Sequence, residues 1–372
     1  MDAFLMGNRA AAAKKAAASE NKGAKIEKPL PWVEKYRPKN VDEVAFQTEV
    51  VAVLKKCLSG GDLPNLLFYG PPGTGKTSAI LALARQLFGP ELYRNRVLEM
   101  NASDERGIQI VRDKIKQFAK HAVGSAAVRR DGSTVPPLKL VILDEADSMT
   151  NAAQAALRRT IERESKTTRF CLICNYISRI IDPITSRCAK FRFKPLDRES
   201  QLERLNFICA QEGVKIDNDA LESLIDACEG DLRKSVTFLQ SAARLHSGEP
   251  EENRQIVTLD QVRELVGSVP SPVMDTFVKA CRSARYETVE TTVQTIRRLG
   301  YSTLQLLTQL HDLIIDDPIL GGVNKAMVLE KIALCESRLL DGANEYLQAM
   351  DASATAMLEY GKSVSDFAMD EN

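Results

Sequence analysis

Residues 70–77 read Gly70-Pro71-Pro72-Gly73-Thr74-Gly75-Lys76-Thr77, a complete G-x-x-x-x-G-K-[ST] loop. An apolar run at 66–69 comes directly before it, and residues 78–87 carry helix-forming residues at helical spacing. This order predicts a strand, a phosphate-binding loop and a helix, with the phosphates at the N-terminus of the helix. The glycines turn backbone N–H groups inward, Lys76 reaches the β and γ phosphates, and the Thr77 hydroxyl ligates Mg²⁺. The loop therefore predicts a nucleoside triphosphate site in an α/β fold.

Length and composition indicate a globular protein of more than one domain. The chain has 372 residues, which favours two or three domains, with 44% hydrophobic and 27% charged residues. Fifty basic and fifty acidic residues give a net charge of zero, so any contact with nucleic acid must come from a local basic patch. The absence of a long apolar run and of a signal peptide predicts an intracellular protein that does not span a membrane. Eight scattered cysteines fit free thiols in a reducing compartment.

Two acids follow the apolar run at 138–143. Asp144, at the tip of this predicted strand, can hold Mg²⁺ through water. The adjacent Glu145 can orient and activate a water molecule for attack on the γ phosphate. Together with the upstream phosphate loop, this pair predicts hydrolysis of the nucleotide in addition to its binding.

A further buried strand is predicted at 169–174, followed directly by Asn175. A polar side chain at the carboxyl edge of the sheet can reach the γ phosphate or the attacking water. Cys171 and Cys174 have a spacing found in metal sites, but three residues apart in a strand they point to opposite faces. With no second cysteine pair or histidine pair nearby, the sequence predicts no zinc site. Residues 191–193 predict a short alternating strand.

Several segments before residue 165 leave two interpretations open. Residues 31–38, with the only tryptophan, either form an extended segment packed on the core or line a base pocket. A helix is predicted from 41 to 58, and a second one through 108–118 carries basic residues. Such a basic helix face is either solvated or a track for DNA phosphates. Residues 121–137 predict a surface loop, and 152–164 predict a helix that carries Arg158.

Beyond Pro195 the patterns are helical. Helices are predicted at 198–212, 217–228 and 231–246, then a polar linker at 247–255, then helices through 258–366. Arg233 lies in the first turn of the helix that Asp231 begins, where a positive charge opposes the helix dipole. Arg233 is therefore not placed for local stability and is a candidate for contact with an anion from another domain.

The chain resembles the small subunits of replication factor C, the eukaryotic sliding-clamp loader of the AAA+ ATPase superfamily. The resemblance covers residues from Pro31 to the C-terminal helices. It is carried by the phosphate loop and by five further stretches: residues 32–38, Asn101-Ala-Ser-Asp-Glu-Arg-Gly107, Leu143-Asp-Glu-Ala-Asp147, Ser186-Arg-Cys188 and Gly230-Asp-Leu-Arg233. Residues 1–28 are rich in Ala and Lys with no aromatic after Phe4, which predicts a disordered tail. The resemblance implies an AAA+ P-loop core with a parallel sheet at 29–194, a small helical lid at 195–256 and an all-α collar for oligomerisation at 257–372.

The resemblance also implies roles for individual residues, with ATP and Mg²⁺ as the bound groups. Arg187 corresponds to an arginine finger that acts on the ATP of the neighbouring subunit, and Asn101 to a residue that holds Glu145 away from water until DNA arrives. The implied catalytic set is Glu145, Lys76, Asn175, Arg187 and Arg233, the Mg²⁺ set is Thr77 and Asp144, and the DNA-backbone set is Arg106, Arg112 and Arg158. The implied nucleotide-binding set is Val33, Tyr36, Arg37, Pro38, Val44, Gly70, Pro71, Pro72, Gly73, Thr74, Gly75, Lys76, Thr77, Ser78, Asn175 and Arg233.

The implied setting is the nucleus, in a heteropentameric ring of replication factor C subunits. The implied partners are the sliding clamp, proliferating cell nuclear antigen, and primer–template DNA junctions, with no membrane involved. One alternative is a structural subunit with little hydrolysis of its own, which the intact Lys76 and Glu145 disfavour. Another is a different DNA-associated AAA+ ATPase, which usually adds a winged-helix module. A small-molecule kinase is disfavoured by Asn175, Arg187 and Arg233.

Overall fold

The computed structural model describes residues 30–44, 47–60, 62–103, 108–120, 127–128, 134–245 and 256–370. The chain divides into two units, one ending at Arg37 and one beginning at Pro38, and each is described by itself. The tail predicted at 1–28 lies outside the described residues. In the first unit, α2 (Trp32–Lys35) forms one helical turn in which the N–H groups of Glu34 and Lys35 bond to the Pro31 carbonyl. Residues 32–35 are therefore helical, so the extended interpretation was wrong for this part of 31–38.

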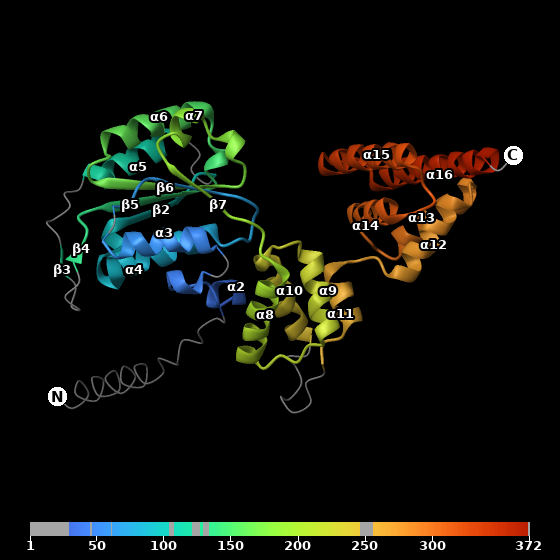
Figure 1. Cartoon of the computed structure of the whole chain (residues 1–372), viewed down its shortest axis with the longest axis horizontal. Coiled ribbons are helices and arrows are strands. Elements are labelled where there is room, and N and C mark those ends of the chain that lie inside the picture. Colours follow the sequence, from blue (N-terminus) through green and yellow to red (C-terminus); the bar gives the residue numbers. More distant parts are fainter. Residues whose placement is uncertain are drawn as a thin grey trace, which may run out of the picture. The chain divides into compact units, whose positions relative to one another are not determined.

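The second unit contains a parallel five-stranded sheet (Figure 1). Its strands are β2 (Val97–Asn101), β5 (Lys139–Asp144), β6 (Thr168–Cys174), β1 (Leu66–Tyr69) and β7 (Ala189–Arg192), in that spatial order. Every neighbouring pair is parallel. All carboxyl ends consequently lie at one edge of the sheet, where ligands bind in open α/β folds. The predicted α/β class and the predicted strands are confirmed.

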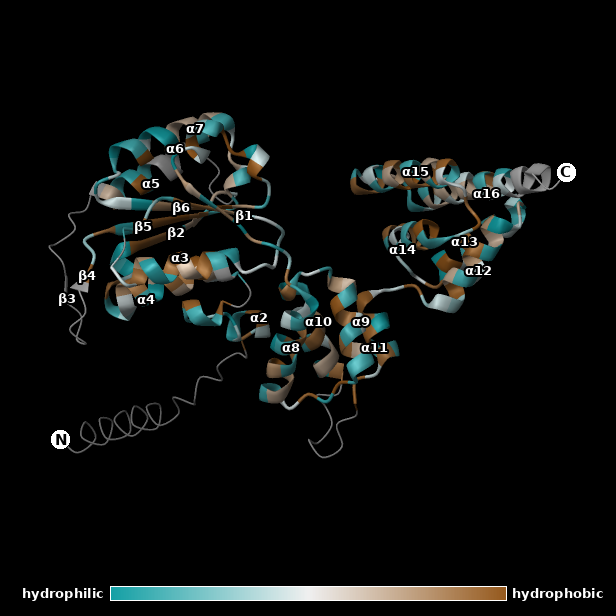
Figure 2. Cartoon of the chain, in the orientation of Figure 1, coloured by the Kyte–Doolittle hydropathy of each residue, from teal (hydrophilic) through white to brown (hydrophobic). Residues whose placement is uncertain are grey.

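Helices bury both faces of the sheet. Figure 1 shows α3 (Thr48–Leu58) and α4 (Lys76–Arg96) on one face and α5 (Ile108–Lys120) and α6 (Asn151–Arg163) on the other. A strand buried on both sides reads as a continuous apolar run, and Figure 2 shows the central strands coloured hydrophobic. Cys171 packs in the core on the α3–α4 side and Cys174 in the core on the other side, as the strand period predicts. All eight cysteines are free and buried.

Some element bounds differ from the prediction. The helix expected at 41–58 is a 3₁₀ turn, η1 (Val41–Glu43), followed by α3, and α4 runs past a kink at Gly89 as far as Arg96. The loop expected at 121–137 contains a small antiparallel pair, β3 (Ala127–Val128) with β4 (Thr134–Val135), and Val135 is buried in the core. Strands of two residues are too short to show an alternating pattern.

A helical segment follows β7. It comprises α8 (Arg198–Glu212), α9 (Asn218–Cys228), α10 (Leu232–Leu245) and α11 (Leu259–Val266). Helix α11 contacts α9 and α10, and Val257 forms a bridge with Ile216. The bundle thus continues beyond residue 256, where the sequence analysis ended the lid. The linker predicted at 247–255 lies outside the described residues.

The last helices form a separate hydrophobic core. They are α12 (Ser271–Arg282), α13 (Tyr286–Arg298), α14 (Thr303–Asp316), α15 (Gly322–Leu340) and α16 (Glu345–Asp370). The described elements from 259 onward are all helices, in agreement with the predicted helical C-terminal part. No helix in the described part of the chain is long and apolar enough to cross a membrane.

A buried polar cluster ties three of these helices together. Asp317, just after α14, accepts hydrogen bonds from Arg282 of α12 at 2.6 Å and from the Tyr360 hydroxyl of α16 at 2.5 Å. The Ile319 N–H donates to its other oxygen at 2.9 Å. Burial raises the pKa of Asp317, but the hydrogen bonds from Tyr360, Ile319 and Arg282 outweigh burial and lower it below the usual value. The ionised carboxylate is therefore the form that the fold stabilises.

Replacing Asp317 with alanine should destabilise the chain by about 3 kcal/mol, because the Tyr360 hydroxyl and Arg282 lose their buried partner. The wild-type advantage should be full above the ordinary aspartate pKa of 3.8 and should disappear as the pH falls through the lower pKa of the folded state. Urea unfolding as a function of pH measures both effects. Asp312→Ala is the control, since Asp312 is exposed on α14 and should change stability by less than about 0.5 kcal/mol. Equal losses in the two variants would contradict the prediction.

Candidate functional site

The phosphate loop joins β1 to α4 in a conformation that needs glycine. Gly70 has a φ of +142°, and a Cβ there would lie 2.2 Å from the Phe193 carbonyl oxygen. Gly75 has a φ of +89° and is the N-cap of α4. The Thr74 hydroxyl donates to the Pro71 carbonyl at 2.9 Å, which closes the loop on itself. The loop is thus held at the carboxyl edge of the sheet with the helix N-terminus, a natural anion site, directly after it.

Lys76 is 7% exposed and lies inside this loop. Its ammonium donates to the carbonyls of Gly70 and Pro71, both at 2.7 Å, and to Asn175 Oδ1 at 3.0 Å. Burial lowers the pKa of Lys76, and nearby Arg233 lowers it further, while Asp144 acts in the opposite direction. The ammonium is therefore held by neutral oxygens, which the charged oxygens of a polyphosphate can replace.

Thr77 and Asp144 lie together although they are far apart in sequence. The Thr77 hydroxyl donates to Asp144 Oδ2 at 2.7 Å, from the first turn of α4 to the end of β5. A hydroxyl and a carboxylate are both hard oxygen donors of the kind that Mg²⁺ prefers beside phosphates. This pair therefore fits the predicted Mg²⁺ site.

Glu145 has a strained backbone. Its φ of 53° is in the left-handed region, which is uncommon for residues other than glycine. The conformation is fixed because the Glu145 N–H donates to Asp144 Oδ1 at 2.9 Å and its carbonyl accepts from the Ser148 hydroxyl at 2.7 Å. Within the described residues its exposed carboxylate makes no hydrogen bond. Strain of this kind clusters at functional sites, and here it directs the side chain of Glu145 into solvent beside Asp144.

Asn175 follows β6 and is held by a residue that the sequence analysis did not single out. Asp147 Oδ2 accepts hydrogen bonds from the N–H groups of Asn175 at 3.1 Å and Tyr176 at 3.2 Å. This fixes the turn after β6 so that the Asn175 amide oxygen meets Lys76. Asp147 is the third acid of the stretch 144–147, which the sequence shows, but the sequence does not show that Asp147 bonds to the N–H groups after β6.

Asn101 ends β2 opposite Asp144. Its amide oxygen accepts hydrogen bonds from the Ser103 N–H and hydroxyl, both at 3.0 Å. Within the described residues it makes no hydrogen bond to Glu145. The implied role of Asn101 in holding Glu145 away from water stays a prediction.

The start of α10 approaches the phosphate loop. Asp231 caps α10, since its Oδ1 accepts from the N–H groups of Arg233 at 2.9 Å and Lys234 at 3.2 Å. A Cβ on Gly73 would lie 1.8 Å from that same oxygen, so only glycine fits at this position. Arg233 is close enough to lower the pKa of Lys76. The start of α10, which carries Arg233, therefore lies against the phosphate loop at Gly73, while contact of Arg233 with an anion stays a prediction.

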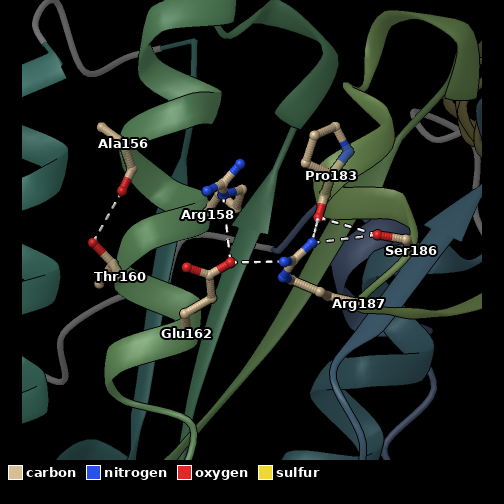
Figure 3. A network of polar contacts seen from close by, with 7 residues as sticks. All are labelled: Ala156, Arg158, Thr160, Glu162, Pro183, Ser186 and Arg187. Atoms are coloured by element: carbon tan, nitrogen blue, oxygen red, sulfur yellow. Dashed lines mark hydrogen bonds and ion pairs between the residues drawn. The ribbon is translucent and has the colours of Figure 1, made fainter.

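Arg187 follows the short helix α7 (Asp182–Thr185) and belongs to a network at the surface (Figure 3). Its Nη1 donates to the Pro183 carbonyl at 2.6 Å, and its Nη2 lies 2.8 Å from Glu162 Oε1 on α6. Arg158 Nε lies 3.4 Å from the same carboxylate oxygen. The side chain of Arg187 is 40% exposed. None of the contacts described for Arg187 involves the cluster around Lys76.

The remaining predicted site residues are not brought to the site by a described contact. Val44 is 6% exposed and packs in the core. Val33, Tyr36 and Arg37 lie in the first unit, and Pro38 begins the second, so their contact with adenine stays a prediction. Arg106 lies outside the described residues. Arg112 lies on α5, but its side chain is not among those described.

Comparison with known proteins agrees with this arrangement. Residues 66–196 match the model of the ATPase family associated with various cellular activities (AAA). Residues 203–244 match the RCF1/5-like AAA+ ATPase lid domain, and 269–355 match the replication factor C C-terminal domain. Replication factor C subunit 4 of Homo sapiens is 54% identical over 368 residues, which cover 96% of this chain and 98% of that protein. The chain belongs to the replication factor C family.

Other members of the family are similar over most of their length. Replication factor C subunit 2 of Schizosaccharomyces pombe is 50% identical over 87% of this chain and 93% of that protein. The replication factor C small subunit of Archaeoglobus fulgidus is 45% identical over 85% of this chain and 94% of that protein. The AAA core, lid and C-terminal helical domain of a replication factor C subunit are therefore all present in this chain, and its P-loop is that of a nucleotide-binding ATPase.

Proposed function

We propose that this chain is an ATPase subunit of a sliding-clamp loader, which uses ATP to open the clamp and place it at primer–template junctions. One observation carries the proposal. At the carboxyl edge of an AAA sheet, Lys76 bonds to Asn175 and the adjacent Thr77 bonds to Asp144, which Glu145 follows in the chain. Each has the side chain that phosphoryl transfer to water requires. Membership of the replication factor C family supports the proposal that the clamp and DNA are its partners and that it acts in the nucleus.

Each residue at the Lys76 site has a separate proposed role. Lys76 and the loop N–H groups bind the phosphates, Thr77 and Asp144 hold Mg²⁺, and Asn175 orients the γ phosphate or the attacking water. Glu145, free of hydrogen bonds among the described residues, accepts a proton from that water. A Mg²⁺ ion held there would stabilise negative charge on the phosphate oxygens. Arg233, from the lid, adds a cation.

Arg187 is proposed to serve a different site. It is half-exposed, and its described contacts lie on α6 and α7 and not with Lys76 or Asn175. An arginine on the surface of one subunit can reach the ATP of the next subunit in a ring, as arginine fingers supplied in trans do. An isolated subunit would then hydrolyse ATP very slowly, and assembly on DNA and clamp would switch hydrolysis on.

The C-terminal helical domain is the proposed surface for ring assembly. Val323, Met327 and Leu334 on α15 are 77%, 49% and 46% exposed and recur at helical spacing. Figure 2 shows hydrophobic positions along this helix. An apolar stripe of this kind on a soluble domain marks a protein interface, and a collar of neighbouring subunits is the partner that the family supplies.

Clamp loading tests the proposal directly. A complex that contains this subunit should retain labelled clamp on primed circular DNA with ATP, and should retain none when Lys76→Ala prevents this subunit from gripping the phosphates. DNA without a primer junction is the control. Equal retention by the wild-type and Lys76→Ala complexes, with both fully assembled, would contradict the proposal that ATP at this subunit drives loading.

A further inference from the structure

Glu162 is a surface carboxylate that two arginines share. Its Oε1 lies 2.8 Å from Arg187 Nη2 and 3.4 Å from Arg158 Nε, and all three side chains are 40% exposed (Figure 3). The proposed function assigns Arg187 to the ATP of a neighbour, and the family resemblance implies contact of Arg158 with DNA phosphates. Among the described residues, Glu162 is therefore the one acid in contact with both.

Local helix stability does not explain Glu162. It lies in the last turn of α6, where the helix dipole disfavours a negative charge. Its pair with Arg158 at i,i+4 has the cation on the N-terminal side, which is the weaker orientation for such a pair. An acid with these two local disadvantages is placed for its contact with Arg187.

Glu162 belongs to a different element of the fold from the other groups that hold Arg187. Pro183 and Ser186, whose carbonyl and hydroxyl oxygens lie 2.6 Å and 3.4 Å from Arg187 Nη1, belong to the same short segment as Arg187 and move with it. Glu162 belongs to α6, which packs on the sheet through Leu157 and Ile161. Among the described contacts, Glu162 is what fixes the guanidinium relative to the core.

We propose that Glu162 is a positioning residue that orients Arg187 toward the neighbouring ATP, and that Arg158 modulates this hold. The inference rests on the proposed function of Arg187. Because both guanidiniums share one carboxylate oxygen, each weakens the hold of Glu162 on the other. A DNA phosphate that recruits Arg158 leaves Glu162 wholly to Arg187, which connects DNA binding to the finger through a single side chain.

The assembled complex with clamp and primed DNA provides the test. Glu162→Gln keeps the size of the side chain and an acceptor oxygen but removes its charge. It should lower kcat for ATP at the neighbouring site by about 10- to 100-fold, the scale for a misplaced catalytic group, with the KM for ATP unchanged within about twofold. It should have no further effect in an Arg187→Ala background. Glu164→Gln, which removes a carboxylate paired only with Arg163 among the described ion pairs, is the matched control.

Arg158→Ala tests the shared oxygen. It should raise the rate measured without DNA by about twofold, the scale of one exposed ion pair at this spacing, because Glu162 then holds Arg187 alone. A residue that only binds DNA would leave that rate unchanged, and this outcome would overturn the modulating role of Arg158.

The outcomes separate this inference from the function it rests on. If Arg187→Ala lowers turnover strongly and Glu162→Gln does not, the positioning role is wrong and the finger stands. If Arg187→Ala itself has no effect, the finger is wrong. A loss from Glu162→Gln that persists in the Arg187→Ala background would show that Glu162 acts elsewhere. Glu162→Asp keeps the charge and should have a rate between those of Glu162→Gln and the wild type. If the complex with Glu162→Gln does not assemble, Glu162→Asp is measured in its place.

Discussion

Arg187→Ala in this subunit alone should remove ATP hydrolysis at the neighbouring subunit's site while ATP binding at the Lys76 site persists. An arginine finger is worth about 10³- to 10⁵-fold in rate, or roughly 4 to 7 kcal/mol of barrier. Rapid-quench measurement of the reconstituted complex on primed DNA should show one fewer ADP per complex in the first turnover. The reason is geometric, since the described contacts of Arg187 lie on α6 and α7 and not at the site of its own chain.

A partial-rescue variant and a control variant accompany Arg187→Ala. Arg187→Lys keeps the charge but loses the planar fork of donors, so it should restore only part of the rate. Arg198→Ala removes an exposed arginine that pairs with Glu222 on the lid and should leave the first turnover intact. An unchanged first turnover in Arg187→Ala would mean that the residue is structural and that the ring does not work by a cation supplied in trans.

The core of the fold was predictable because its strands are buried on both faces. The runs at 66–69, 140–143 and 170–174 contain no charged residue, and each leads directly to a site residue at the carboxyl edge: Gly70, Asp144 and Asn175. A parallel sheet places such ends at one edge, and because β1 and β6 are neighbours in it, Asn175 meets Lys76 there. The pair of β3 and β4 was missed because its strands have two residues each.

Residues that act through another side chain were harder to predict. Asp147 holds the turn at Asn175, and this contact depends on the loop after β5 reaching the end of β6. Glu162 carried a local signal, an acid in the last turn of a helix, of the same kind that drew attention to Arg233. Its partner Arg187 is 25 positions away in sequence (187 minus 162), after an intervening strand, so spacing could not identify the pair.

Glu145→Gln should stop hydrolysis at this subunit's own site while ATP and Mg²⁺ still bind. Removing a general base costs about 10²- to 10⁴-fold in rate. Binding should persist because the Glu145 carboxylate makes no hydrogen bond among the described residues, and the Lys76 and Thr77–Asp144 contacts do not involve it. The complex should form one fewer ADP in the first turnover, and equilibrium binding of a fluorescent ATP analogue should be unchanged. Glu99→Gln, an exposed glutamate on β2, is the control.

Combining Glu145→Gln with Arg187→Ala decides whether the two residues serve one site or two. If Arg187 acts on the neighbour, the losses fall on different ATP molecules, and the double variant forms two fewer ADP per complex. If both act on the same ATP, the double variant forms only one fewer, because a second lesion cannot remove a turnover already lost. An unchanged first turnover in Glu145→Gln alone would favour the structural-subunit alternative, in which this chain binds ATP to shape the ring and leaves hydrolysis to its neighbours.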